Sequence, residues 1–281
     1  MYLYSLIAAM LVALVIFLVP KRYKVWVATG VVSLVALAAI TVAVMAFMGQ
    51  PVELVKFVTP FFGQESLAID KLSALMLIII SVASVATLLY SKGYVGGYLE
   101  RYSDAHISIH YTALVTLVVS MMLVVMSSGG FSFLFVWELM TIASFMLILF
   151  EAERQEVRRA ALNYLVMMHI GFLFLVVGFV MLHNVTNSAN FEAINDYYAQ
   201  ANLLPLFVVL FIGFGMKAGL FPMHIWLPEA HPAAPSHVSA IMSGVMIKTG
   251  VYGIIRLMQV EEIEADMLFT LGLIILVAGA V

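Results

Sequence analysis

The sequence predicts an all-α integral membrane protein: a polytopic helix bundle with about eight complete transmembrane helices and the start of a ninth. Hydrophobic residues make up 64% of its 281 residues, charged residues only 10%, and the mean hydropathy is +1.10. Soluble globular domains do not have this composition. Apolar runs recur along the whole chain, and most charges lie between them. Helices are expected because a spanning segment must satisfy its own backbone hydrogen bonds in lipid.

Each predicted span is an apolar run of roughly 17 to 25 residues, the length that crosses a bilayer. In chain order the spans are 2–19, 25–48, 72–90, 109–127, 131–150, 161–183, 204–221 and 236–258. A ninth run begins near Met267 and is cut off at Val281. A chain that ends inside a helix would leave backbone groups unsatisfied in lipid. We therefore expect the front part of a longer protein or, alternatively, a short terminal helix completed by neighbouring chains.

The distribution of Lys and Arg predicts the orientation of the chain, because positive loops stay on the cytoplasmic side. Loops after the first, third and fifth spans hold eight such residues: Lys21, Arg22, Lys24, Lys92, Arg101, Arg154, Arg158 and Arg159. Loops after the second, fourth and sixth hold only Lys56 and Lys71. The N-terminus is therefore expected outside a prokaryotic inner membrane. The first span lacks a preceding basic segment, as expected of a retained helix rather than a cleaved signal peptide.

Several kinds of chemistry are excluded or disfavoured on this chain. There is no cysteine, hence no disulfide, thiol nucleophile, cysteine-ligated zinc or iron–sulfur cluster. No His pair has the spacing of a helical zinc site, and no glycine-rich loop matches a nucleotide-binding motif. No basic run suggests nucleic acid. We expect no cofactor, metal or catalytic residue here, so any redox chemistry would take place on another chain.

Three charged residues fall inside predicted spans: Glu138 in "FLFVWELMTIASF", Lys217 in "GFGMKAGLFP" and Lys248 in "IMSGVMIKTGVYGIIR". A charge near the bilayer centre costs at least about 2.5 kcal/mol, so such residues usually face the bundle interior and pair, or line an ion path. Pro222 is expected to break the helix that carries Lys217, because it cannot donate to the carbonyl of Ala218. A broken helix at membrane depth is tolerated where it is buried or lines a wet cavity.

Each charge also has a plainer interpretation. Glu138 could lock its helix to a neighbour by an ion pair, and Lys217 could bond the carbonyls at a helix end. Lys248 lies too deep for easy snorkelling. Taken together, they favour a polar axis for protons, because burial penalises the charged form of lysine and a nearby carboxylate favours it. Moving Glu138 relative to Lys217 would then make the lysine take up or release a proton.

Four histidines are candidate proton relays. His169 falls in the sixth span, and "FPMHIWLPEAHPAAPSH" carries His224, His231 and His237 through the expected helix break. Neutral imidazoles can pass protons between waters near physiological pH. An ordinary buried or loop histidine is an equally good interpretation of His169 and His237, and a better one of the other two.

The segment "GFGMKAGLFPMHIWLPEAHPAAPSHVSAIMSGVMIKTGVYGIIR", with "WELMTIASF" and "RRAALNYLVMMHIGF", resembles the antiporter-like, proton-translocating membrane subunits of complex I, Mrp cation/proton antiporters and group 4 hydrogenases or formate hydrogenlyases. The resemblance covers roughly the fourth to the eighth helix. It implies about fourteen helices in two inverted repeats. It divides this chain into an N-terminal three-helix segment (1–105), a first five-helix repeat (106–260) and the start of a second (261–281).

Position by position, the resemblance implies that Glu138 and Lys217 form a modulating pair and that Lys248 leads toward a central hydrophilic axis. Lysine rather than histidine on the eighth helix favours a complex I M-type, Mrp D-type or hydrogenase-type subunit. The implied function is proton translocation within a redox-driven complex that resembles NADH:quinone oxidoreductase or a membrane-bound hydrogenase. The implied partners are the lipid bilayer, other antiporter-like and small membrane subunits, and peripheral iron–sulfur or nickel–iron subunits. A stand-alone Mrp-type Na⁺/H⁺ antiporter subunit and a membrane scaffold are the alternatives.

Overall fold

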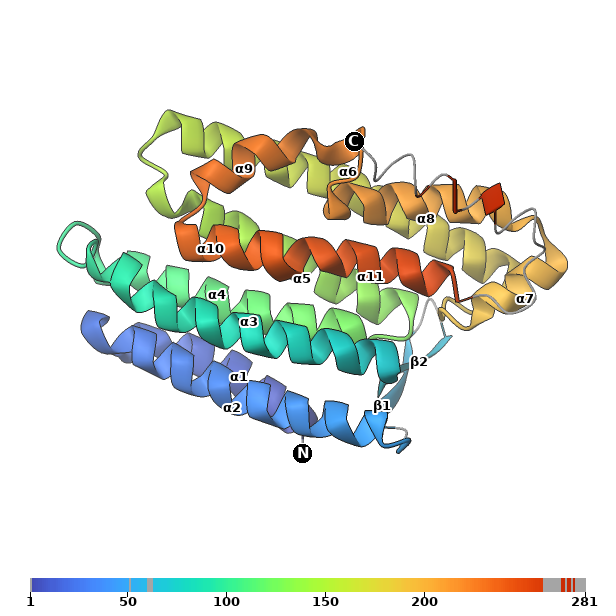
Figure 1. The fold of residues 1–281 in the computed structure, drawn as a ribbon, viewed down its shortest axis with the longest axis horizontal. Coiled ribbons are helices and arrows are strands. Elements are labelled where there is room, and N and C mark those ends of the chain that lie inside the picture. The colour runs from blue at the N-terminus through green and yellow to red at the C-terminus, as the bar shows by residue number, and fades with distance from the viewer. Residues whose placement is uncertain are drawn as a thin grey trace.

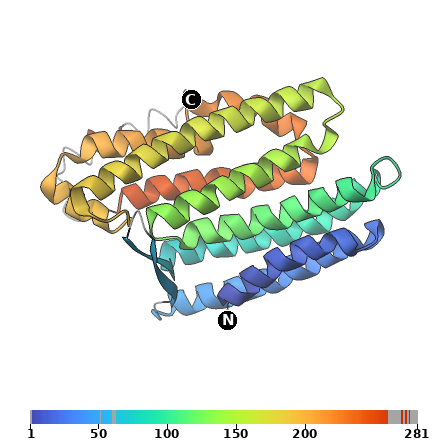
Figure 2. The same ribbon diagram turned by 180° about the vertical axis from the view of Figure 1, so that it is seen from behind.

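The computed structural model describes residues 2–50, 52–59 and 63–259, together with residues 269, 270, 272, 273 and 275. Most of the predicted ninth span and of the segment 261–281 lies outside these residues. The described helices run roughly alongside one another in an elongated bundle (Figure 1). Figure 2 shows the same bundle from behind, with α6 along one edge and α1 and α2 along the other. The helices are α1 (Tyr2–Val15), α2 (Lys21–Phe47), α3 (Lys71–Gly96), α4 (Asp104–Met126), α5 (Gly130–Ile148), α6 (Gln155–Thr186), α7 (Ala193–Gln200), α8 (Leu203–Ala218), α9 (Leu227–Ala233), α10 (Ser236–Ile241) and α11 (Ile247–Leu257).

The predicted fold class is confirmed. Seven helical stretches in the described part are long and apolar enough to cross a membrane, and a shorter apolar helix covers Tyr2–Leu18. Every one of the eight complete predicted spans coincides with one of these. Two helices begin before their apolar runs: α4 begins at Asp104 rather than 109, and α6 at Gln155 rather than 161. Helices extend past the apolar run because polar residues continue them, as where the Ser103 hydroxyl accepts from the backbone N–H of His106.

A two-stranded hairpin and a short helix were not predicted. Strands β1 (Val52–Thr59) and β2 (Gly63–Ile69) pair antiparallel between α2 and α3. Glu65 of β2 is 1% exposed and accepts from the backbone N–H groups of Phe131 (2.9 Å) and Ser132 (2.8 Å). A carboxylate at this place satisfies donors that the first turn of a helix leaves free. The hairpin therefore caps α5, the helix that carries Glu138.

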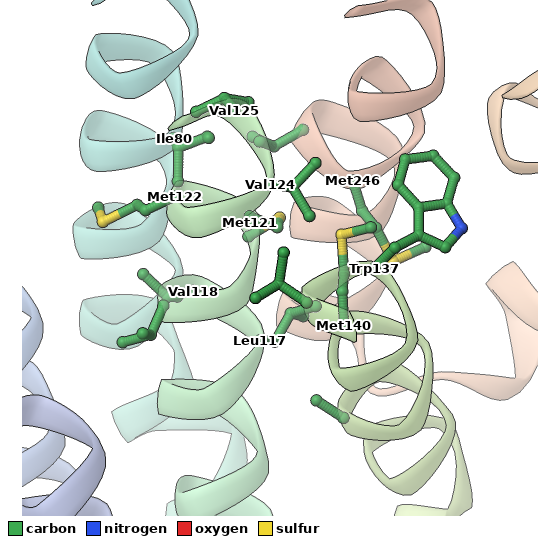
Figure 3. Close-up of a cluster of buried hydrophobic side chains, with 14 of the residues drawn as sticks. Ile80, Leu117, Val118, Met121, Met122, Val124, Val125, Trp137, Met140 and Met246 are labelled. Carbon is green, nitrogen blue, oxygen red and sulfur yellow. The ribbon is translucent and has the colours of Figure 1, made fainter. Parts of the chain in front are cut away.

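Helix α4 is the most deeply buried helix of the described bundle, with 78% of its apolar window inside. Its Met121 and Val124 lie between Ile80 of α3 on one side and Trp137 and Met140 of α5 on the other (Figure 3). All five side chains are at most 1% exposed. Lipid is as apolar as these side chains, so the contacts stabilise the bundle mainly through close packing. This rigid centre holds α5 in place.

Helices α6 and α8 approach each other closely at glycines. A Cβ on Gly213 of α8 would lie 2.9 Å from the carbonyl oxygen of Gly171 on α6, too close for a side chain. Small residues of this kind let transmembrane helices pack backbone to backbone. The contact sets the position of Lys217 one turn further along α8.

The helix break lies earlier than predicted. Helix α8 ends at Ala218, and Gly219 adopts the left-handed conformation with φ 68°. The backbone N–H of Leu220 donates back to the carbonyl of Gly215 (3.0 Å), which closes the helix end. Pro222 instead precedes a short 3₁₀ turn, Met223–Trp226, that leads into α9. The helix ends early because Gly219 adopts the left-handed conformation without strain, before Pro222 can interrupt the helix.

The predicted eighth span is one continuous helical rod with a wide turn inside it. Between α10 and α11, residues Met242–Met246 form a π-helical segment. At the far end of α11, Arg256 binds Asp70, the N-cap of α3, and donates to the Ser73 hydroxyl (2.8 Å). Tyr252 also donates to the carbonyl of Val125 on α4 (2.8 Å). These polar contacts tie the end of α11 to α3 and α4.

The basic loops gather at one end of the bundle, called here the basic end. The α3–α4 and α5–α6 connections and α9 lie at this end, and the hairpin and α7 lie at the opposite one (Figure 1). Lys21 donates to the carbonyl of Tyr102 (2.8 Å), and Arg101 pairs with Glu153, so the loops also contact one another. The segregation of positive charge expected from the sequence is therefore present in three dimensions.

Candidate functional site

Lys217 lies in the interior of the bundle, as predicted. Its side chain is 1% exposed, at the end of α8. The ammonium donates to the hydroxyl of Thr141 on α5 (2.9 Å) and, at 3.5 Å, to the hydroxyl of Tyr164 on α6. It also lies 5.4 Å from the centre of the Trp137 ring, within cation–π range. An ammonium has three N–H donors, and in the described part of the chain these partners are all uncharged.

Glu138 does not form an ion pair with Lys217 in this structure. Its Oε1 lies 3.0 Å from Nε2 of His169 on α6. The carboxylate is 20% exposed. Glu138 and Thr141 are three residues apart and so share one face of α5. Helix α5 therefore presents a carboxylate and, one turn on, the hydroxyl that holds the lysine.

His169, a candidate relay of the sixth span, lies beside Glu138. Its Nδ1 lies 2.9 Å from the carbonyl oxygen of Leu165 on its own helix. A carbonyl can only accept, so Nδ1 carries a hydrogen. The nitrogen that gains or loses a proton is then Nε2, the one beside Glu138. The ring is 49% exposed on the outer side of α6, so Glu138 and His169 lie between the buried lysine and the bundle surface.

Lys248 is not in the interior of the described bundle, contrary to the prediction. Its side chain is exposed, and its ammonium donates to the carbonyl of Ser243 (2.5 Å) inside the π-helical segment. The apolar residues around Lys248 placed it at membrane depth but could not show which face of α11 is covered. In the described residues its contacts include neither Glu138 nor Lys217.

The other candidate histidines lie along the segment from Met223 to Ser239. His224 faces Phe221, with ring centres 5.8 Å apart. His231 is half-buried, and its Nδ1 lies 3.0 Å from the Ser239 hydroxyl. His237 is 1% exposed and contacts a histidine of α4. The structure therefore does not collect the four histidines into one row with Lys217.

Sequence reasoning missed the neutral partners of Lys217. Thr141 lies one turn after Glu138, and Tyr164 lies within "RRAALNYLVMMHIGF". The Tyr164 hydroxyl also lies 2.5 Å from the Ser144 hydroxyl. This contact joins α5 and α6 beside the lysine. Their helical spacing could have been noticed, but single hydroxyls in apolar helices are common and usually bond their own backbone.

The fold and these contacts define a multi-pass membrane protein with ionisable side chains held among transmembrane helices. Residues 127–281, more than half of the chain, match the family described as NADH:quinone oxidoreductase/Mrp antiporter, TM. The chain belongs to this family.

A curated relative agrees with this assignment, and two solved structures share the fold. The chain is 31% identical over 228 residues to hydrogenase-4 component B of Escherichia coli K12, covering 80% of this chain and 33% of the relative. Its fold is similar to a chain of the membrane-bound sulfane sulfur reductase, an archaeal respiratory membrane complex (TM-score 0.78, 22% identity, 95% of this chain and 42% of that one). It is also similar to a chain of the Mrp complex from Dietzia sp. DQ12-45-1b (TM-score 0.77, 19% identity, 92% and 48%).

These relatives are subunits of multi-subunit membrane complexes. The chain spans about a third of the length of the curated relative and less than half of each structural neighbour. The structural neighbours are below 25% identical and bear on the fold alone.

Proposed function

We propose that this chain moves protons across the membrane as a subunit of a redox-driven respiratory or hydrogenase complex. Glu138 and Lys217 are the central groups, His169 exchanges protons with Glu138, and Lys248 continues the path. The chain itself carries no redox chemistry and no cofactor. The observation that carries the proposal is the position of Lys217: an ammonium with 1% exposure whose hydrogen-bond partners in the described chain are two neutral hydroxyls.

The mechanism uses the competition between burial and charge at Lys217. Burial penalises the ammonium, and the approach of a carboxylate favours it. When Glu138 is charged and free of His169, its field retains the proton on Lys217. When Glu138 is neutralised, or its charge is balanced by a protonated His169, Lys217 releases its proton. The hydroxyls of Thr141 and Tyr164 stay beside the amine in both states, because a hydroxyl can donate as well as accept.

Lys248 would accept the proton that leaves Lys217, although it lies on a different surface of the bundle. It is exposed on α11, beside a π-helical segment, and such segments are frequent at functional sites. Helices α8 and α11 are in close contact, since a Cβ on Gly250 would lie 2.6 Å from the carbonyl oxygen of Phe214. A proton leaving Lys217 could therefore reach the side of the bundle that carries Lys248 by crossing a single helix interface.

The first test is Lys217→Ala in the full complex, reconstituted into liposomes, with proton uptake followed by a pH-sensitive dye under a potassium diffusion potential. We expect at least a tenfold loss of uptake with normal assembly. Lys56→Ala is the matched control, because Lys56 is exposed on the hairpin and pairs with the exposed Glu53. Full proton uptake by an assembled Lys217→Ala complex would refute the proposal and favour a scaffold.

A stand-alone Na⁺/H⁺ antiporter subunit is the second candidate, because the family and one structural neighbour include Mrp antiporters. Gentle solubilisation separates the two. The redox-driven proposal expects co-purification with iron–sulfur or nickel–iron subunits. Co-purification with small hydrophobic subunits alone would favour the antiporter.

A further inference from the structure

Two histidines far apart in the sequence meet inside the basic end of the bundle. His110 of α4 is 3% exposed and His237 of α10 is 1% exposed. Their Nε2 atoms lie 2.8 Å apart, within hydrogen-bond distance. The pair is separate from the Lys217 site, and His110 was not among the residues that the sequence suggested.

The geometry restricts the protonation of the pair. In an N···N hydrogen bond one nitrogen donates and the other accepts, so the two Nε2 atoms share a single proton and at least one ring is neutral. The two Nδ1 atoms are also buried, and neither has a hydrogen-bond partner in the described part of the chain. A pair that served only to join α4 to α10 would leave both of these atoms unsatisfied, which is costly in a protein interior.

A set of phenols and one carboxylate connects the pair with the surface of the basic end. The Tyr94 ring centre lies 5.3 Å from that of His237. Tyr94 and Tyr98 both donate to Oε1 of Glu151, at 3.5 and 2.7 Å. The Glu151 side chain is 15% exposed and pairs with Arg154 at 3.5 Å. Hydrogen bonding to Tyr94 and Glu151 raises the pKa of Tyr98, so this phenol remains a donor and Glu151 remains the acceptor.

The two histidines have different surroundings: aromatic rings pack against His110, and a surface groove lies beside His237. On α4, His106 and Tyr111 flank His110, and Phe150 packs against it with ring centres 4.6 Å apart. On the α3 side, a surface groove reaches His237. The groove is lined by Ala83, Ala86, Thr87, Tyr90, Ser236, His237 and Ala240. The groove therefore lies beside His237, whereas Phe150 packs against His110.

We propose that His110 and His237 form a proton-relay site that carries protons between the basic end and the interior, an inference that rests on the proposed function. A proton binds Nδ1 of His237. The shared proton then moves from Nε2 of His237 to Nε2 of His110, and the proton on Nδ1 of His110 passes to water in the bundle interior. One proton enters and one leaves, and both rings end in their other neutral tautomer. Water that enters the groove beside His237 supplies the proton at the outer side.

The test uses His237→Gln and His110→Gln in the full complex in liposomes, with the same dye measurement of proton uptake. Glutamine can keep a hydrogen bond across the interface but cannot pass a proton from one side of a ring to the other. We expect normal assembly and thermal stability with at least a fivefold loss of proton uptake. His183→Gln is the matched control, because His183 lies in the last turn of α6, away from the basic end. The complex with this variant should take up protons normally. Normal uptake by both relay variants would reduce the pair to a structural contact.

A measurement on the unaltered protein covers the case in which the variants fail to assemble. With ¹⁵N-labelled histidine in lipid bilayers, NMR distinguishes the two neutral tautomers of each ring. The relay predicts both tautomers for His110 and for His237, in exchange with water. A single fixed tautomer on each ring would overturn the proposal.

Failure of the relay is distinguishable from failure of the proposed function. Loss of proton uptake in Lys217→Ala with normal uptake in both histidine variants refutes the relay alone. Normal uptake in Lys217→Ala refutes the proposed function, whatever the histidine variants do.

Discussion

Two lysines are buried in the described bundle, and their surroundings differ. Lys24 of α2 is 0% exposed and donates to the Asp104 carboxylate (2.9 Å), the Ser108 hydroxyl (2.7 Å) and the carbonyl of Ile16 (2.9 Å). Its three N–H donors thus have three acceptors, one of them charged. Lys217 has two neutral hydroxyls. Burial alone therefore does not indicate a proton carrier; the partners do. Lys24 has the contacts of a structural ion pair, whereas Lys217 exchanges its proton only under the proposed function.

The largest expected effect on stability comes from removing Asp104, the carboxylate partner of Lys24. Asp104→Ala leaves a fully buried ammonium without its counter-charge, and we expect the free energy of unfolding to fall by about 3 kcal/mol. Lys24→Met should cost less, about 1 to 2 kcal/mol, because the Asp104 side chain is 49% exposed and water can solvate it. Denaturant unfolding in mixed micelles measures both.

Asp196→Ala, an exposed position on α7, is the control for loss of a carboxylate. A larger cost for Lys24→Met than for Asp104→Ala would contradict the structural interpretation of the pair. It would also weaken the contrast with Lys217.

Each of the two buried lysines donates to a hydroxyl that can be removed separately: Thr141 for Lys217 and Ser108 for Lys24. Thr141→Val removes the 2.9 Å acceptor of Lys217 at nearly constant volume. Loss of one such bond, about 1.4 kcal/mol, should lower proton uptake about tenfold. Ser108→Ala removes the 2.7 Å acceptor of Lys24 and should lower the free energy of unfolding by about 1 kcal/mol without changing uptake. Equal losses of uptake in the two variants would show that hydroxyl partners do not distinguish the two lysines.

The sequence was sufficient to predict the spans and the buried Lys217, because each depends on local chemistry. Hydropathy places helices in lipid, and a charge within an apolar run must be held by the protein. What it could not predict depends on contacts between distant segments. Lys24 was placed in a loop because "KRYK" is basic, yet helix α2 begins at Lys21 and turns Lys24 inward toward Asp104.

The partners of Glu138 and Lys248 also depended on tertiary contacts. Which residue Glu138 meets is decided by the packing of α5 on α6, where His169 lies closer than Lys217. Whether Lys248 is covered is decided by which face of α11 packs against α8. No pattern within one helix contains this information. The hairpin was missed because its alternation of apolar and charged residues is short and lies beside much stronger helical segments.

The smallest expected effect on stability is at the ion pair between Arg256 and Asp70, which lies at the end of the bundle opposite the basic end. The Asp70 carboxylate there is only partly buried. Burial raises the pKa of Asp70, but hydrogen bonds from Arg256 and the backbone of Ser73, with the charge of Arg256, outweigh it and hold the pKa below its ordinary range. The unfolded chain therefore binds a proton on Asp70 at a higher pH than the folded chain does. The stability from this pair is fully present above about pH 4 and is lost as pH falls through the folded pKa.

Because Asp70 is 48% exposed, the pair is expected to contribute less than about 1 kcal/mol. Unfolding midpoints of the unaltered chain and of Arg256→Met should differ by a constant amount from pH 7 to about pH 5, and the difference should shrink below about pH 4. A difference that stays constant to pH 3 would mean that Arg256 acts through packing on Tyr252 and not through Asp70. The pair would then resemble neither buried lysine, since its charge would have no measurable role. A shrinking difference would place it with Lys24, as a structural charge whose partner is ionised.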